Sequence, residues 1–234
     1  MKHASLVFML LVSVLPAQNP VPPGTVLPLS LETTLNIQKI RPAKVIRAEV
    51  MQNIPGTAIH KGARVFGHVL SVTPSSIALT FDTLVANGKR IPIITNLRAL
   101  ASMMAIEEAQ IPEGGADRGL PPRDKTTTQI GGEQVYHGGG PVTRGMTTVA
   151  EPTPYGARGR LQSNPPCRAA IAENYAPQAL WLFSTNACGI YGYNHLSIEH
   201  SGRTNPVGTI ILSSRPGKLH IRSGSGLLLR VQGS

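Results

Sequence analysis

The dipeptide Asn87-Gly88 is the strongest local structural signal in this 234-residue chain. It stands between two runs of β-forming residues, and both of its members tolerate the positive φ angles that a two-residue type I′ turn requires. Polar and apolar residues also alternate in segments 44–50 and 77–81, which is the period of a half-buried strand. The sequence therefore predicts short antiparallel strands joined by tight turns.

Composition narrows the fold class further. The chain contains 24 glycines and 20 prolines, almost a fifth of its residues, whereas these two types make up roughly 12% of average proteins. Only 15% of the residues are charged and 4% are aromatic. These values exclude a coiled coil, a helical bundle and a polytopic membrane protein. We expect an all-β fold: a barrel-like or sandwich β domain with one short helix and a long Gly/Pro-rich insertion.

The expected organisation has six parts. They are a signal peptide (1–17), a linker (18–23), a first β region (24–98), a short helix (99–110), a Gly/Pro-rich excursion (111–166) and a second β region (167–234) that completes the same β domain.

Three local predictions come with this organisation. Leu97, Leu100 and Met104 have helical spacing within segment 96–108, which predicts a short packing helix, with a methionine-lined groove as the alternative. The continuous apolar run 179–183 predicts a strand covered on both faces. Segments 218–222 and 227–231, joined by a Ser/Gly turn, predict a closing hairpin.

The N-terminus has the features of an export signal. A short basic segment with Lys2 precedes an apolar run at 6–15, and Pro16-Ala17 then provides a small-residue cleavage site. The run is shorter than the ~20 residues that a spanning helix needs, so we expect cleavage and no retained transmembrane helix.

Export gives a role to the two cysteines. Cys167 and Cys188 are the only cysteines in the chain, and oxidising compartments allow such a pair to close. We expect a disulfide that contributes on the order of 3 kcal/mol, because it would close a loop of about twenty residues. A catalytic thiol is the alternative, but no motif places a histidine and an orienting carboxylate beside either cysteine.

Five segments resemble one known family in the same order along the chain. Residues 21–36 are similar to the "P-x-G-T-x-h-P…L-x-T-x-h-N" opening of the C-terminal β-barrel of the TrbI/VirB10 family. Residues 45–54 and 59–67 resemble that family's next strand and its "I-P-x-G-S-x-h-h-G" turn. Residues 219–224 and 227–231 resemble its closing "h-x-I-R-x-G-x-x-h-x-V-x-V" segment. The resemblance spans residues 21–95 and 218–231.

The resemblance implies a barrel-like fold and a cell-envelope location. Members of that family are structural and form a ring-shaped channel across the periplasm and outer membrane. This chain departs from them because it carries a cleavable signal, His60 in place of proline and Asn53 in place of aspartate. Conjugation and energy sensing therefore do not carry over.

Positive charge is concentrated in the first β region. The net charge is +10, and residues 18–100 hold nine Lys/Arg against three acidic residues. Such a field attracts polyanions, which for an exported protein include lipopolysaccharide phosphates, anionic lipids and acidic polysaccharides. A solvated face without a specific ligand is the alternative. The anion-binding candidates are Lys39, Arg41, Lys44, Arg47, Lys61, Arg64, Lys89 and Arg90.

Other groups of reactive residues are weaker. His195, Glu199 and His200 would not converge on a metal, because His200 takes the opposite face of a strand. The loop His137–Gly140 lacks the Gly-x-Ser-x-Gly partner of esterases, and the adjacent Glu107 and Glu108 point apart on a helix. We therefore expect no catalytic, cofactor or metal site.

Two functions follow. The first is a non-enzymatic structural or assembly protein of the bacterial envelope, periplasmic, outer-membrane-associated or secreted, with other envelope proteins or copies of itself as partners. The alternative is a monomeric basic module that binds an anionic glycan or lipid. Nucleic acid is not expected, because no aromatic residues are interleaved with the basic cluster.

The signal peptide can be tested directly. We expect the exported protein to begin at Gln18, because Ala17 is the small residue before the cleavage site. N-terminal sequencing and intact mass of the exported protein measure this. An intact Met1 in the exported protein would contradict the prediction.

Overall fold

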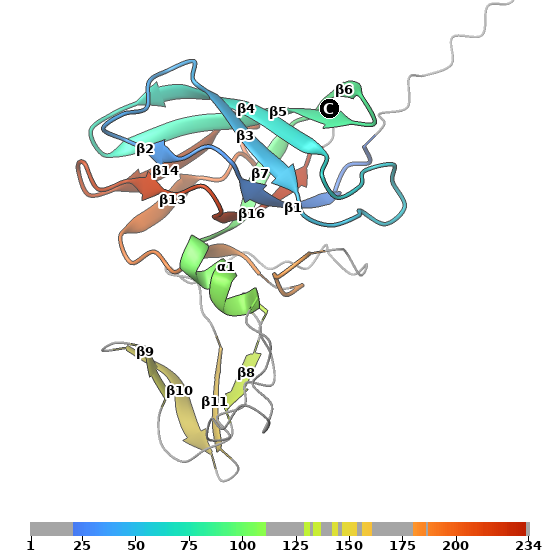
Figure 1. Ribbon diagram of the computed structural model, residues 1–234. Coiled ribbons are helices and arrows are strands. Elements are labelled where there is room, and N and C mark those ends of the chain that lie inside the picture. The colour runs from blue at the N-terminus through green and yellow to red at the C-terminus, as the bar shows by residue number, and fades with distance from the viewer. Residues whose placement is uncertain are drawn as a thin grey trace, which may run out of the picture.

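The computed structural model describes residues 21–110, 129–131, 133–136, 142–144, 147–153, 156–160, 180–185 and 187–232. Most of these residues lie in strands (Figure 1), and the fold is all-β and barrel-like, as the sequence predicts.

One ten-stranded sheet forms the barrel. Its strands follow the order β12-β7-β16-β1-β3-β4-β5-β14-β13, and β6 pairs with β5 outside this path. All neighbours are antiparallel except β12 and β7. The bounds are β1 Val26–Leu31, β3 Val45–Val50, β4 Arg64–Val72, β5 Ser76–Ala86, β6 Lys89–Pro92, β7 Thr95–Ala101, β12 Gly189–Tyr191, β13 Leu196–His200, β14 Ile210–Ser214 and β16 Gly226–Val231.

The sheet curls until its two ends meet. β12 pairs with β7 at one end of the strand order, and the chain then runs from β12 into β13 at the other end. Just beyond β13, the Ser201 carbonyl accepts a hydrogen bond of 2.8 Å from the Leu97 N–H of β7. The barrel is therefore nearly closed, and strands from both β regions belong to one sheet.

Apolar side chains fill the barrel. On β3, Ile46, Ala48 and Val50 are buried while Arg47 is exposed, which confirms the predicted alternation. Phe81 of β5 is 2% exposed and lies among buried leucines and isoleucines from the other strands. One small void with apolar walls lies in this core. The part of the barrel that the structure describes is thus a packed core without a lumen.

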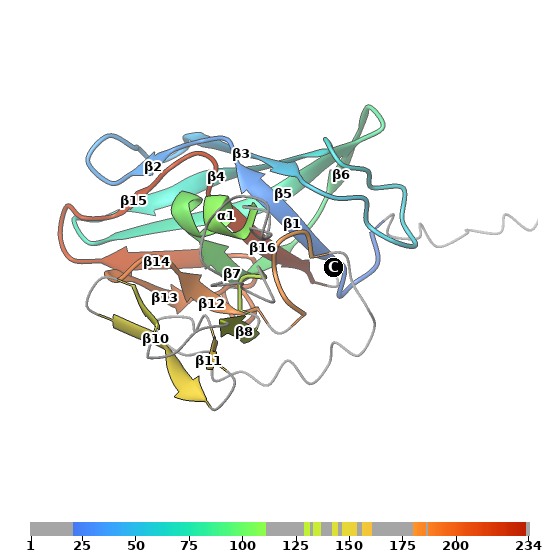
Figure 2. The same cartoon turned by 60° about the horizontal axis from the view of Figure 1, so that its bottom comes forward.

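A second apolar layer covers part of the outside of the barrel. Helix α1 (Met103–Gln110) and residues of segments 129–131 and 180–187 pack against the outer faces of β1, β7 and β16 (Figure 2). These three strands are consequently buried on both faces along most of their length. Within the described residues, no helix is both long enough and apolar enough to cross a bilayer.

The helix begins later than the sequence predicts. Leu97 and Leu100 belong to β7, where they pair with Leu229 and Leu227 of β16 and are buried. Tertiary pairing thus overrides their helical spacing. Met104 is 68% exposed, so its predicted core position is wrong.

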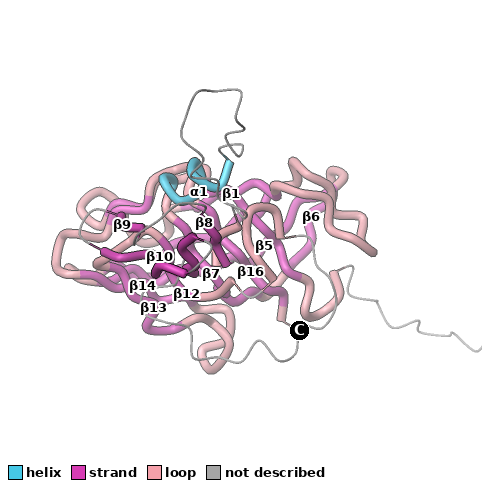
Figure 3. The backbone as a smooth tube through the Cα atoms, turned by 90° about the horizontal axis from the view of Figure 1, so that it is seen from below, coloured by secondary structure: helices cyan, strands magenta, loops and turns pink. Residues whose placement is uncertain are grey.

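Two smaller sheets complete the described structure. One is a four-stranded antiparallel sheet in the order β8-β11-β10-β9, on the side of the molecule that carries α1 (Figure 3). Its strands are β8 Glu133–Tyr136, β9 Val142–Arg144, β10 Thr147–Thr153 and β11 Gly156–Arg160, within the Gly/Pro-rich excursion. The other pairs β2 (Leu35–Asn36) with β15 (His220–Ile221).

The Asn87-Gly88 hairpin is confirmed. β5 and β6 pair through Ala86 and Lys89, and the turn residues Asn87 and Gly88 have φ angles of 50° and 73°. β6 has no second partner strand among the described residues. Its Lys, Arg and Pro residues are the types that protect an edge strand from pairing with another chain.

Two predicted strand arrangements are wrong. In segment 179–183, the described residues form a turn, with Trp181 at a φ of 53° and Phe183 in an isolated bridge to Ile130. The run is apolar because it belongs to the second apolar layer, which covers the outer faces of β1, β7 and β16. The two final strands do not pair with each other either: β15 pairs with β2, and β16 lies between β1 and β7.

Gly67 marks the closest approach of β4 and β5, where the register shifts. A Cβ at this position would lie 1.8 Å from the Thr80 carbonyl oxygen, which is backbone and cannot rotate away. The site therefore requires glycine for space.

We expect Gly67→Ala to lower the free energy of unfolding by about 3 kcal/mol, because the two central strands must move apart. Denaturant unfolding measures this, with the exposed Ser71→Ala on the same strand as the control, for which we expect a change within about 0.5 kcal/mol. Equal stability of the two variants would contradict the geometry.

Candidate anion-binding surface and other polar sites

The structure divides the eight predicted anion-binding residues. All eight are exposed. Lys39, Arg41 and Lys44 precede β3, and Arg47 lies on its outer face. The remaining four, Lys61, Arg64, Lys89 and Arg90, lie toward the opposite end of the strands, near the turn after β3 and the β5–β6 hairpin. The predicted basic face thus has a group at each end, with Arg47 between them in the middle of β3, one register step from Arg64.

The second group borders an open hollow. Residues 60–64 form one side of this hollow and residues 85–88 form the other. Arg64 pairs in register with Val85, and Val85 pairs with Arg90, so these three side chains share the outer face of the sheet. Among the described residues, neither Lys61 nor Arg64 forms an ion pair, although Glu49 lies opposite Arg64 across the β3–β4 pair.

Hydrogen bonds to backbone groups fix the walls of the hollow. The Asn87 side-chain amide donates to the Ala58 carbonyl over 3.1 Å and so ties the hairpin to the loop before β4. The Lys61 N–H donates to Asn53 Oδ1 over 2.9 Å, and the Gly62 N–H donates to the Val50 carbonyl over 2.8 Å. The hollow is therefore formed before any ligand arrives.

The first group is held differently. The Arg41 guanidinium donates from Nη1 to the Ile40 carbonyl over 2.9 Å and to the Gln38 carbonyl over 3.3 Å. The Arg41 guanidinium thus satisfies two carbonyls of the turn that precedes β3. Neither Lys39 nor Lys44 lines a hollow described in this structure.

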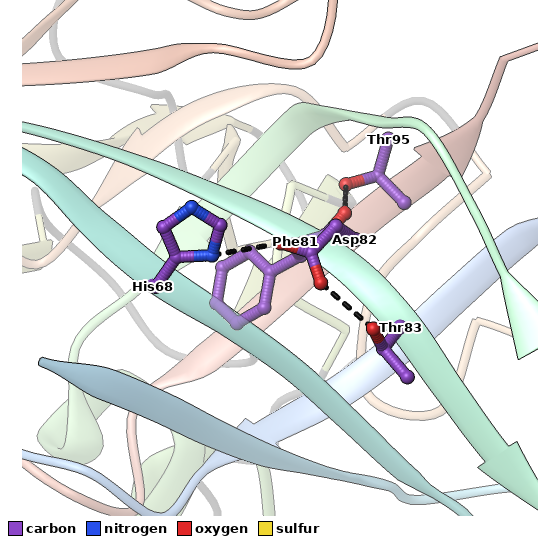
Figure 4. A network of polar contacts seen from close by, with 5 residues as sticks. All are labelled: His68, Phe81, Asp82, Thr83 and Thr95. Atoms are coloured by element: carbon purple, nitrogen blue, oxygen red, sulfur yellow. Dashed lines mark hydrogen bonds and ion pairs between the residues drawn. The ribbon is translucent and has the colours of Figure 1, made fainter. Parts of the chain in front are cut away.

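His68 and Asp82 form a polar network on the outer face of β4 and β5 (Figure 4). His68 Nδ1 lies 2.8 Å from Asp82 Oδ2, and the Thr83 hydroxyl donates to Asp82 Oδ1 over 2.8 Å. Beneath them, the buried Thr95 hydroxyl donates to the Phe81 carbonyl over 2.9 Å. Both members of the pair are more than a third exposed, so the contact is worth at most about 1 kcal/mol.

Sequence reasoning missed this pair because its members are fourteen positions apart. Only the β4–β5 register, including the bulge beside Gly67, brings them together. His60, which lines the hollow, was noted only as a departure from a family pattern.

His195, just before β13, and His200, its last residue, contact backbone and hydroxyl groups. His200 Nδ1 lies 2.6 Å from the Thr209 carbonyl oxygen, and its Nε2 lies 3.2 Å from the Thr204 hydroxyl. His195 Nε2 lies 3.1 Å from the Lys218 carbonyl oxygen. No group of three or more metal-ligating side chains occurs among the residues that the structure describes.

Arg98 connects the barrel to the segment outside it. Its Nε donates to the Ala187 carbonyl over 3.0 Å, and its Nη2 donates to the Thr185 carbonyl. Burial lowers the pKa of the guanidinium below its ordinary value, and the nearby charge of Arg230 lowers it further, while Tyr191 acts in the opposite direction. Sequence alone offered no signal for this role, because the carbonyls lie almost ninety residues away.

Some predicted residues lie outside the described part of the chain. They include His137–Gly140 and Cys167, and the side chain of Glu108 is likewise not described; Glu107 is exposed on α1. Cys188 is not a free thiol. Its pairing with Cys167 stays a prediction.

Tyr193 and Ser225 form a buried polar contact between the β12–β13 connection and the start of β16. Their hydroxyl oxygens lie 2.9 Å apart, and Ser225 is fully buried. Burial raises the pKa of the Tyr193 phenol above its ordinary value of 10.0, although the hydrogen bond with Ser225 and the charge of Arg222 act in the opposite direction.

No protein-family model, curated protein or solved structure matches this chain.

We expect Tyr193→Phe to lower stability by about 1 kcal/mol near neutral pH, because the buried Ser225 hydroxyl loses its partner. Above pH 10.0 the unfolded phenol loses its proton before the folded one does, so the free energy of unfolding of the parent protein falls as pH rises. The variant has no phenol at this position and lacks this contribution to the pH dependence. Denaturant unfolding at pH 8 and pH 10.5 measures both effects. Parallel pH dependence in parent and variant would contradict the raised pKa.

Proposed function

We propose that this protein is a non-enzymatic structural or assembly component of a bacterial cell envelope, exported through its N-terminal signal. The observation that carries the proposal is the filled barrel. Since one barrel has no lumen, a passage can form only between copies or between this chain and other envelope proteins. Contacts on the outside of the barrel are thus where such a protein would act.

The pairing of β1 with β16 supports the envelope assignment. The segments that resemble the TrbI/VirB10 barrel lie at the two ends of the chain, and five register pairs from Val26–Arg230 to Ser30–Gly226 join them in one sheet. The parts that resemble the family therefore form a continuous structural unit.

The outer face of β3 and β4 offers a contact surface. Val45 is 52% exposed and Leu70 is 41% exposed, and Val45 pairs in register with His68 on the neighbouring strand. Lys44 precedes Val45, and Arg47 shares its face of β3. Exposed apolar side chains beside an arginine are compatible with a protein–protein contact, where arginine is enriched.

The native mass tests the proposal. We expect the exported, oxidised protein to elute as a discrete oligomer in size-exclusion chromatography with light scattering. Val45→Glu should shift it toward monomer, whereas Val207→Glu, at an equally exposed valine in the loop between β13 and β14, should not (53% exposed).

A monomer at all concentrations would contradict self-assembly and favour the alternative of a monomeric basic module. Equal dissociation by both valine variants would place the contact elsewhere.

A further inference from the structure

The hollow beside Lys61 and Arg64 has three features of a binding site. Its two walls come from different connections, Lys61 and Arg64 line it without forming an ion pair, and hydrogen bonds hold its walls in place. The eight basic residues do not all share these features, because Lys39, Arg41 and Lys44 lie away from it.

We propose that this hollow binds a phosphate group, with the Lys61 ammonium and the Arg64 guanidinium as the contacting cations. The proposal does not depend on the assembly role. Phosphate suits the hollow because a tetrahedral oxyanion accepts hydrogen bonds from several directions, and His60, Lys61 and Arg64 border one space. A planar carboxylate is matched best by a single bidentate fork from one side.

Lys89 and Arg90 contribute charge but do not line the hollow. They belong to the edge strand β6, where basic residues also prevent pairing with another chain. Two cations at the hollow itself, Lys61 and Arg64, therefore carry the specific contact.

Glu49 is the acidic residue nearest in register to the site. It lies opposite Arg64 across the β3–β4 pair, on the same face of the sheet, without forming an ion pair. Its negative charge opposes an incoming phosphate. Removal of that charge should strengthen binding about twofold, since the two groups interact across solvent-exposed surface.

The test compares two charge-matched double variants of the full chain. Lys61→Ala with Arg64→Ala removes two positive charges at the hollow, and Lys39→Ala with Lys44→Ala removes two at the other end of β3. All four residues are exposed, so unfolding midpoints should match the parent protein. Calorimetry with inorganic pyrophosphate as the probe measures affinity at 50 mM and 200 mM salt.

We expect the first variant to bind pyrophosphate at least tenfold more weakly and the second to bind within about twofold of the parent. Glu49→Gln should bind more tightly than the parent. Equal losses in the two double variants would show a diffuse electrostatic field and overturn the site. Binding of malonate as tightly as pyrophosphate would overturn the choice of phosphate.

A second arm identifies the source of the phosphate. Co-sedimentation uses phosphatidylcholine vesicles with and without 20% phosphatidic acid. Binding to the acidic vesicles alone, lost in the Lys61/Arg64 variant, supports the site with a lipid headgroup as its ligand. Binding to pyrophosphate alone supports it with a soluble phosphate compound. Failure to bind either probe would overturn the proposal.

Discussion

The pairing of β1 with β16 is the contact on which the rest of the structure depends. Leu27 and Leu29 pair with Leu229 and Leu227, and all four face the barrel core. The alternate residues Val26 and Leu228 face the second apolar layer beneath α1. One pair of strands thus belongs to two cores, and it joins segments about two hundred residues apart. β16 also pairs with β7, which in turn pairs with β12, so loss of the β1–β16 pairing would divide the sheet.

This arrangement explains which features the sequence could predict. The β5–β6 hairpin follows from Asn87-Gly88 alone, and the alternation of β3 follows from one buried face. The spacing of Leu97 and Leu100 predicts a helix wrongly, because their burial comes from β16, far away in the chain. The run 179–183 predicts a strand wrongly, because a continuous apolar segment can cover a surface as a turn as well as cross a core as a strand. The sequence predicts a strand correctly where its pairing partner is close in the chain, as in the β5–β6 hairpin, and fails where the partner is distant, as for β7.

The polar sites follow the same rule. The sequence identifies the basic residues correctly as exposed, but their grouping depends on which end of a strand each one occupies. Lys44 and Lys61 lie at opposite ends of β3 and its following turn, roughly 17 Å or more apart at 3.4 Å per strand residue. His68 and Asp82 meet only through a bulge, and Arg98 meets its carbonyls only through the fold. The exposure of the basic residues was therefore predictable from the sequence, whereas which polar side chains lie together was not.

The barrel has two unlike outer sides. β1, β7 and β16 are covered by α1 and segment 180–187, whereas β3, β4, β5 and β6 keep their outer faces in solvent, with the basic hollow at one end. Since the interior is filled, this open side holds both the Val45–Leu70 surface and the proposed phosphate site. An assembly contact across β3 and β4 would bring cations of neighbouring copies close together. A bound phosphate would reduce that repulsion, so anion binding and assembly on this side would favour each other.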